Sequence, residues 1–344
     1  MQSQISSNLF LNNMLVHTRV FSLEKDFLLK DHVIDGTPFV PFVMMLEELV
    51  NVGSSTRLSS SVSVSLNEIV SQENDFCFSE GINSDSNKRA TELIDVVLSL
   101  PIMLRKGRAR EISTVSKADL LMLTDAAGNE IIHGKHENSS LSKMVNCVSN
   151  ELKKYYSIFN LHNNLNDING IVDTNSYTIK LSEAKVLLSF NRDALYPNFF
   201  FHGPSLQADF SILEYCASGA FIEISGLPSR YKDEPHVVAG DLSLQAAALF
   251  AISRRNVNLL PLSCTSYSRI DDFPKEIQKL FVYIFEGSTG YNIICFVRTE
   301  NITNDLYKPI MFWNGLKFTE MSAQPGDSAK KIISKINGIP LIPH

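Results

Sequence analysis

Cysteine is scarce in this sequence and tryptophan is nearly absent. The 344 residues include five cysteines and one tryptophan, and no two cysteines form a Cys-x-x-Cys pair. An odd number of widely separated cysteines is typical of free thiols rather than of a disulfide framework. We therefore expect a cytoplasmic protein, reduced at Cys77, Cys147, Cys216, Cys264 and Cys295.

Basic clusters and long hydrophobic runs are also missing. The net charge is -6 and the Lys and Arg residues are dispersed, whereas a protein that neutralises phosphates needs a basic surface. No run reaches the roughly 18 apolar residues of a membrane span. The segment Met1 to Asn8 has neither the basic region nor the apolar core of a signal peptide. These absences predict neither nucleic acid nor membrane as a partner, and they favour small molecules or proteins.

The histidines do not form a recognisable metal-binding pattern. His133 and His136 have the spacing of two ligands, but no third ligand lies near them in the sequence. We interpret this pair as the solvated end of a strand and predict no metal site. His17, His162, His236 and His344 have no motif around them and are expected at the surface or in turns.

The hydropathy pattern indicates two similar halves. With 44% hydrophobic and 20% charged residues, the chain has room for two ordinary cores or one large one. In the first half an apolar helical pattern follows Pro41, at a position where a helix tolerates proline. Strands are expected around that helix at Met14 to Leu23, Phe27 to Ile34, Ser61 to Leu66, Thr91 to Leu104, Ile112 to Thr124 and Glu130 to His133.

The same plan returns in the second half. Residues 141–159 have helical spacing, and residues 160–176 have the polar composition of a linker. A second apolar helix is expected to begin at Asp241. The repeated plan indicates an internal duplication, with one unit at 1–137, a connecting helix and linker at 138–176, and a second unit at 177–344. Strands are expected around this helix at Tyr177 to Phe190, Leu206 to Ile224, Leu259 to Tyr267, Gln278 to Phe285, Tyr291 to Thr299 and Ile310 to Phe318.

One stretch, from Lys30 to Pro41, brings a histidine to a backbone corner. Its residues His32, Gly36 and Pro41 have the spacing HxxxGxxxxP, and a glycine and two prolines there prevent a continuous helix or strand. Taken alone, this is ordinary turn chemistry.

Three further segments follow in a fixed order. They are His202-Gly203-Pro204-Ser205-Leu206-Gln207, Asp241-Leu242-Ser243-Leu244-Gln245 and Leu260-Pro261-Leu262-Ser263. The four segments together resemble the signatures HxxxGxxxxP, YGPxF, DxxxQ and LPF of the dehydratase domains of polyketide and polyunsaturated fatty acid synthases. The resemblance covers nearly the whole chain. It implies an α+β fold, the double hotdog, in which antiparallel sheets are each wrapped around a central helix and join edge to edge.

The resemblance also implies a reaction and the residues that perform it. Removing water from a 3-hydroxyacyl thioester needs a base for the α proton and an acid for the departing hydroxyl. By the resemblance, His32 is the base and Asp241 is the acid, with Gln245 one helical turn beyond Asp241. The Gly36 N–H is expected to approach the thioester oxygen, and Gln245, Pro41, His202 and Gly203 are expected near the substrate.

Simpler interpretations exist for each of these residues. Asp241 is also a good helix N-cap, Gln245 a good surface residue, and Gly203-Pro204 a good turn. A helix N-terminus favours the carboxylate of Asp241 whereas apolar neighbours favour its acid form, so we treat His32 and Asp241 as a coupled pair. His202 stands where the family usually has tyrosine, and either titrates in the cavity or points away from it.

The expected activity is that of a 3-hydroxyacyl-[acyl carrier protein] dehydratase with no bound cofactor. The phosphopantetheine of an acyl carrier protein would present the substrate, and other synthase domains are the expected partners because the chain has no carrier segment. A homodimer is left open. The alternatives are a product template-like cyclase or an enoyl isomerase on the same fold, and a catalytically silent assembly module. Intact His32 and Asp241 count against the silent module.

Overall fold

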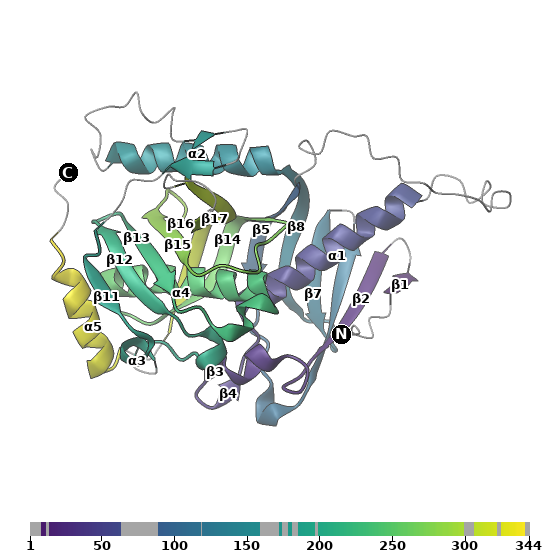
Figure 1. The fold of residues 1–344 in the computed structure, drawn as a ribbon. Helices are drawn as coiled ribbons and strands as arrows, with labels where there is room; N and C mark the ends of the chain where they lie inside the picture. The colour runs from purple at the N-terminus through teal and green to yellow at the C-terminus, as the bar shows by residue number, and fades with distance from the viewer. Residues whose placement is uncertain are drawn as a thin grey trace.

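One continuous antiparallel sheet curves around two long helices (Figure 1). The structure, a computed structural model, describes residues 8–11, 14–62, 89–117, 119–158, 172–173, 178–180, 185–196, 199–298, 306–321 and 325–340. Within these residues the sheet has 15 strands, and β3 (Val33–Ile34) and β4 (Thr37–Pro38) form a separate two-stranded hairpin.

The N-terminal half of the sheet wraps around helix α1 (Phe42–Val62). The helix begins directly after Pro41, as predicted, and its residues from Phe42 to Val50 are buried. The strands run across the sheet in the order β1 (Asn8–Leu11), β2 (Met14–Phe21), β6 (Arg110–Lys117), β7 (Leu120–Asp125), β8 (Glu130–Ser140) and β5 (Arg89–Leu98).

The C-terminal half wraps around helix α4 (Pro235–Arg255), which is apolar on all sides and almost wholly buried. A helix with no polar face has to be enclosed, and the sheet encloses it. From the centre of the sheet outward the strands are β14 (Leu259–Ile270), β17 (Leu306–Glu320), β16 (Tyr291–Arg298), β15 (Leu280–Glu286), β13 (Gly219–Ser225), β12 (Asp209–Tyr215) and β11 (Leu188–Phe190), while β9 (Val172–Asp173) and β10 (Thr178–Lys180) extend from β17.

The two halves join edge to edge where β5 pairs with β14, as expected for a double hotdog. The central helices α1 and α4 also contact each other. Within this contact, a Cβ added to Gly240 would lie 2.6 Å from a methyl carbon of Val43. Behind this contact, the buried Glu47 of α1 accepts hydrogen bonds from Tyr267 (2.9 Å) and Arg269 (3.0 Å) of β14. The junction is therefore held by backbone pairing, helix packing and a buried ion pair.

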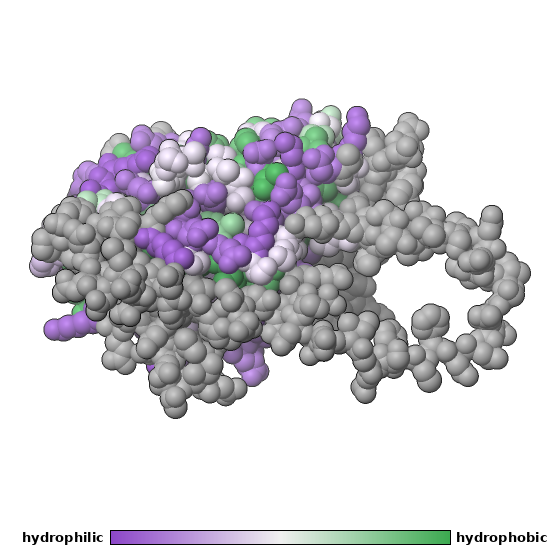
Figure 2. Space-filling model, turned by 90° about the horizontal axis from the view of Figure 1, so that it is seen from above, coloured by the Kyte–Doolittle hydropathy of each residue, from purple (hydrophilic) through white to green (hydrophobic). Residues whose placement is uncertain are grey.

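Three further α-helices in the described part of the chain lie outside the sheet. Helix α2 (Leu141–Ile158), the predicted connecting helix, crosses the outer face at the junction and touches β5, β8, β14 and β17. Seen from this side, the exposed side chains that the structure describes are mostly hydrophilic (Figure 2). Helix α5 (Asp327–Asn337) packs against α4 and was not expected from the sequence. Helix α3 (Arg192–Leu195) is a single turn.

Several predicted element boundaries are wrong. The strand predicted over Phe27 to Ile34 is a 3-10 helix at Phe27–Lys30 followed by the short strand β3 (Val33–Ile34), which pairs with β4 (Thr37–Pro38). A buried apolar run this short suits either structure. The strand predicted at Ser61 to Leu66 is wrong at its start because α1 continues to Val62, and residues 63–66 lie outside the described residues.

In the first half, β6 ends at Lys117 and β7 begins at Leu120 within the single strand predicted for residues 112–124. His133 and His136 lie inside β8 instead of after a strand end, and His133 pairs with Glu130 at 2.8 Å. The strand predicted for residues 177–190 contains β10 and β11. The domain boundaries themselves stay a prediction, and most of the predicted linker, including residues 160–171, lies outside the described residues.

Helix α4 alone, among the described helices, is long and apolar enough by length and composition to cross a membrane, although no such run was expected from the sequence. Of its most apolar stretch, 94% is buried inside the protein. That burial identifies α4 as the core helix of the second half.

His236 in the first turn of α4 differs from the surface residue expected. Its ring packs edge-on against Phe273, with centroids 4.6 Å apart, and its buried Nε2 has no hydrogen-bond partner. Burial, followed by the charges of Arg269 and Lys275, lowers the pKa of His236 to about 3. The folded protein therefore holds this imidazole neutral where the unfolded chain would protonate it.

We predict that His236→Phe makes the protein less sensitive to acid. Below pH 6.5 the unfolded chain binds a proton at this position and the folded protein does not. The free energy of unfolding therefore decreases as the pH is lowered from 6.5 to about 3. Removing the imidazole should remove a slope of about 1.4 kcal/mol per pH unit. Urea unfolding at pH 7.5, 6.0 and 5.0 measures it, and identical slopes in both proteins would contradict the assignment.

Candidate active site

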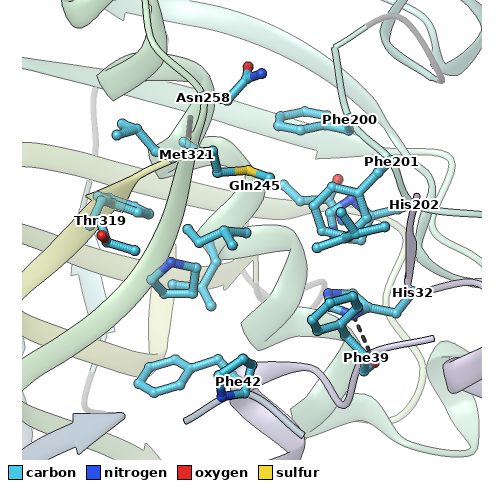
Figure 3. A pocket seen from close by; sticks show the side chains of 18 of the residues that line it. His32, Phe39, Phe42, Phe200, Phe201, His202, Gln245, Asn258, Thr319 and Met321 are labelled. Atoms are coloured by element: carbon cyan, nitrogen blue, oxygen red, sulfur yellow. Dashed lines mark hydrogen bonds between the residues drawn. The ribbon is translucent and has the colours of Figure 1, made fainter. Parts of the chain in front are cut away.

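A cavity of about 430 Å³ lies between the two halves, and the imidazole of His32 and the carboxyl group of Asp241 both line it. Figure 3 shows its wall, with His32 and Phe39 on one side and Gln245 and Met321 on another. Most of the lining is apolar. It includes Phe39, Phe42, Met45, Leu98, Phe199, Phe200, Phe201, Leu244, Ala248, Ile252, Leu259, Phe318 and Met321.

His32 reaches the cavity from the loop between the 3-10 helix and β3. Its Nδ1 lies 2.9 Å from the carbonyl oxygen of Phe39, the contact drawn as a dashed line in Figure 3. A carbonyl only accepts, so Nδ1 carries the proton and the lone pair is on Nε2. Burial, and then the neighbouring His202, lower the pKa of His32 to about 4. The imidazole is therefore neutral near pH 7.

Asp241 enters the cavity from α4, but not at the start of that helix. The helix begins at Pro235, so Asp241 stands nearly two turns inside it and is not an N-cap. The predicted helix start at Asp241 is wrong because an apolar turn with proline in the first position precedes it. Burial raises the pKa of Asp241 against the opposing effects of His32 and a hydrogen bond from Gln245. Of the two influences weighed from the sequence, the apolar surroundings win.

Gln245 holds the carboxyl of Asp241 in place. Its Nε2 donates to Asp241 Oδ2 at 2.8 Å and to the carbonyl of Leu206 at 2.9 Å. Its Oε1 accepts a short hydrogen bond from the hydroxyl of Tyr196. Because the Leu206 carbonyl can only accept, the amide has one consistent orientation. Gln245 is therefore a buried positioning residue, and its alternative as a surface helix residue is wrong.

His202 lies in the cavity beside Asp241, so the alternative in which it points away is wrong. Its Nε2 is 3.4 Å from Asp241 Oδ2, its ring stacks on Phe201 with centroids 4.2 Å apart, and its buried Nδ1 has no hydrogen-bond partner. Burial lowers the pKa of His202 to about 3. His202 is thus neutral near pH 7 and adds no titration there, contrary to the alternative in which it titrates near pH 6.5.

Asp31 ties the two motif loops together. The N–H of Gly203 donates to the backbone oxygen of Asp31 at 2.6 Å, and the N–H of Ser205 donates to its carboxylate at 2.9 Å. The hydroxyl of Ser205 makes a short hydrogen bond to the same carboxylate. An isolated antiparallel bridge then pairs His32 with His202. This clamp brings loops from the two halves into register and sets the position of His32.

The remaining motif residues have structural roles that explain their identity. A Cβ on Gly203 would lie 2.9 Å from the Cβ of Asp31, so the clamp requires a residue without a side chain. Gly36 has φ +73 and Asp35 has φ 48, which together make the tight turn between β3 and β4. His202 and Gln245 line the cavity, but Gly36, Pro41 and Gly203 do not, so a substrate contact at these three residues stays a prediction.

Three features of the site were not predicted from the sequence. Asp31 and Tyr196 act across long stretches of chain, and the position of Asp31 beside His32 is the only local signal for either of them. Residues of the segment before α5 and of α5 itself, Met321, Gly326 and Ala329, line the cavity. By contrast, the LPF-like segment was already identified as the fourth motif of the sequence, and it reaches the cavity through Leu260, Pro261 and Leu262.

Of the comparisons with known proteins, the one with solved structures identifies the fold. No protein-family model and no curated protein sequence matches the chain. Among solved structures, the dehydratase domain from the CurF module of curacin polyketide synthase is similar over 92% of this chain and 97% of its own, with a TM-score of 0.59 and 12% identity. The CurK dehydratase domain of the same synthase is similar over 92% of this chain and 97% of its own, with a TM-score of 0.57 and 13% identity. GphF dehydratase 1 is similar over 90% of this chain and 94% of its own, with a TM-score of 0.56 and 12% identity. The chain has the double-hotdog fold of these domains.

We predict that Gly203→Ala destabilises the protein by about 1–3 kcal/mol, as overpacking of a well-filled site does. The side chain of Asp31 cannot withdraw without breaking its hydrogen bonds to Ser205. Gly326→Ala is the matched control, since no atom lies within 4 Å of a Cβ added there. Urea unfolding compares both variants with the parent. Equal stability of Gly203→Ala and the parent would contradict the clamp.

Proposed function

We propose that the protein is a dehydratase that converts a 3-hydroxyacyl thioester into a 2-enoyl thioester. The observation that carries the proposal is a neutral imidazole and a buried carboxyl with a raised pKa, supplied by different halves of a double hotdog to one largely apolar cavity. The elimination needs one group that accepts a proton and one that donates a proton, held on either side of a carbon–carbon bond.

His32 is the proposed base. Its Nδ1–H is fixed on the Phe39 carbonyl, so the unprotonated Nε2 is the nitrogen left to take the α proton of the substrate. A low pKa keeps Nε2 free of a proton at neutral pH, although it also makes the resting imidazole a weak base. Ionisation of Asp241 strengthens that base as the reaction proceeds, because the carboxylate raises the pKa of His32.

Asp241 is the proposed acid. Burial favours its protonated form, and Gln245 fixes the carboxyl through Oδ2. In the reaction the α C–H bond breaks and its proton goes to His32, while the β C–O bond breaks and the oxygen leaves as water with the proton of Asp241. The carbon–carbon double bond forms between the two centres. The resulting imidazolium and carboxylate reset when the proton passes from His32 to Asp241.

The cavity suits an acyl chain. From Asp241, one side of α4 continues along the wall through Leu244, Ala248 and Ile252. At about 1.5 Å per residue this stretch is about 16 Å long, which matches an extended chain of about a dozen carbons. Apolar walls bind such a chain by removing it from water. The proposed substrate is therefore a 3-hydroxyacyl group with a sizeable apolar tail, of the polyketide or polyunsaturated fatty acid type.

Similar structures support these roles. Two structures of the CurK domain are named as inactive mutants, one with aspartate replaced by asparagine and the other with histidine replaced by phenylalanine. We assign the corresponding chemistry to Asp241 and His32 here. We further propose that the phosphopantetheine of an acyl carrier protein presents the substrate, that other synthase domains supply it, and that the protein needs no bound cofactor. The four cysteines that the structure describes are free, which fits the reducing cytoplasm.

Double-bond isomerisation is a second candidate. One similar structure is a GphF variant named as isomerase-inactive. Moving the double bond of an enoyl product needs a proton removed at one carbon and returned at another, which a His–Asp pair in the same cavity can also do. The position of the double bond in the product distinguishes the two activities.

We expect His32→Gln and Asp241→Asn each to lower the dehydration rate by about 10²–10⁴-fold while the protein stays folded. Each substitution removes one proton carrier and keeps most of the side-chain volume. The measurement is loss of water from a 3-hydroxyacyl carrier protein, followed by mass spectrometry, with circular dichroism as the folding control. Near-parental turnover in either folded variant would refute the assigned role.

We also expect Ala248→Phe to shorten the acyl chain that the protein accepts. Ala248 lines the cavity two turns beyond Asp241, so a larger side chain there should block the far wall while leaving the dyad open. Rates would be compared on carrier-bound substrates of four and twelve carbons. The short substrate serves as the internal control. An unchanged ratio of long-chain to short-chain rates would show that the acyl chain does not follow α4.

A further inference from the structure

His32, His202 and Asp241 together have the composition of a metal site, although no metal site was predicted from the sequence. All three side chains are buried, and their ligand atoms lie within 4.8 Å of one another. Two ligands of a tetrahedral Zn²⁺ ion lie about 3.4 Å apart, given bonds near 2.0–2.1 Å. His202 Nε2 and Asp241 Oδ2 are already separated by 3.4 Å. The other pairs need to close by at most about 1.4 Å.

Groups behind two of the three ligands, His32 and Asp241, orient them as metal sites require. The Nδ1–H of His32 donates to the Phe39 carbonyl, which leaves the Nε2 lone pair for an ion. Asp241 Oδ2 is held by Gln245, which Tyr196 holds in turn. A ligating histidine that donates to a backbone carbonyl, and a ligating carboxylate that is itself hydrogen-bonded, are usual in metal centres.

The site also leaves room for a fourth ligand. Two imidazoles and one carboxylate with an open position are a common ligand set for Zn²⁺, and the cavity supplies the open side. His202 supplies the second imidazole of this set, at a position where the similar family usually has tyrosine. A neutral phenol is a far poorer ligand than a neutral imidazole.

We propose that His32, His202 and Asp241 bind one Zn²⁺ ion per chain, and that the ion competes with the acyl substrate for the cavity. The binding part of the proposal needs only the three ligands. The competition rests on the proposed function, since the ion would occupy both the base and the acid of the dehydration. Zinc would then reversibly inhibit the proposed enzyme.

The test is a titration of the substrate-free protein with Zn²⁺ by calorimetry, and with Co²⁺ by its visible absorption. We expect saturation at one ion per chain. His202→Tyr and Asp241→Asn, each shown to be folded by circular dichroism, should bind at least about 100-fold more weakly. His133→Ala is the matched control, because it removes a half-exposed histidine that pairs with Glu130 on β8 and leaves the cavity intact.

The outcomes separate cleanly. Stoichiometric binding that both cavity variants lose and His133→Ala keeps supports the site. Absence of binding, or binding unchanged in either cavity variant, overturns it. The titration contains no substrate, so failure of the dehydratase proposal leaves this result interpretable. With an active enzyme, inhibition by Zn²⁺ that a higher substrate concentration relieves supports the competition, and inhibition that substrate does not relieve overturns it.

Discussion

The site depends on the hydrogen bonds that Asp31 accepts from the loop containing Gly203 and Ser205. It accepts from the N–H and the hydroxyl of Ser205, while the backbone oxygen of the same residue accepts from Gly203. These bonds join a loop before α1 to a loop before β12, which are separated by 174 positions in the sequence. Once they form, His32 and His202 pair as neighbours. Backbone hydrogen bonds to a charged acceptor are directional, so this clamp fixes orientation as well as distance.

Burial in the cavity is the main cause of the pKa shifts of all three central residues. Burial penalises charge on an imidazole and on a carboxyl alike, so it lowers the pKa of His32 and His202 and raises that of Asp241. Burial thus favours the neutral form of each group, and transfer of one proton from the carboxyl to an imidazole would create an ion pair inside the cavity. Opposite charges attract most strongly where water is excluded, so each charge would stabilise the other during the proposed reaction.

Much of the fold was predictable, because the apolar helices and the strands have clear periodicities. The segment after Pro41 and the segment around Asp241 were both identified as central helices, and β12, β13, β15 and β16 lie close to the predicted strands. The start of α4 was missed although Pro235 at its first position was a readable signal. The 3-10 helix at Phe27–Lys30 was missed because three consecutive apolar residues fit a buried strand equally well.

Only some of the site residues could be predicted from the sequence. His32, Asp241, Gln245 and His202 were identified because four motifs keep their order along the chain. Asp31 and Tyr196 were not, since a hydrogen bond between segments so far apart leaves no periodic signal in one sequence. Gly36 was assigned to catalysis from its motif. Its positive φ in the turn between β3 and β4 is a structural reason for glycine at this position. A motif marks a residue as required, and the structure distinguishes chemistry from backbone geometry as the reason.

The spacing of the proposed base and acid also depends on how the two central helices meet. The loop that carries His32 leads directly into α1, and Asp241 follows Gly240 on α4, where α4 touches Val43 of α1. Any side chain at position 240 would push the helices apart and move Asp241 relative to His32. The buried Glu47–Arg269 pair and the β5–β14 pairing oppose the same displacement from behind. The joint between the two halves therefore does more than enlarge the sheet. The helix contact there sets the distance between His32, which the first half supplies, and Asp241, which the second half supplies.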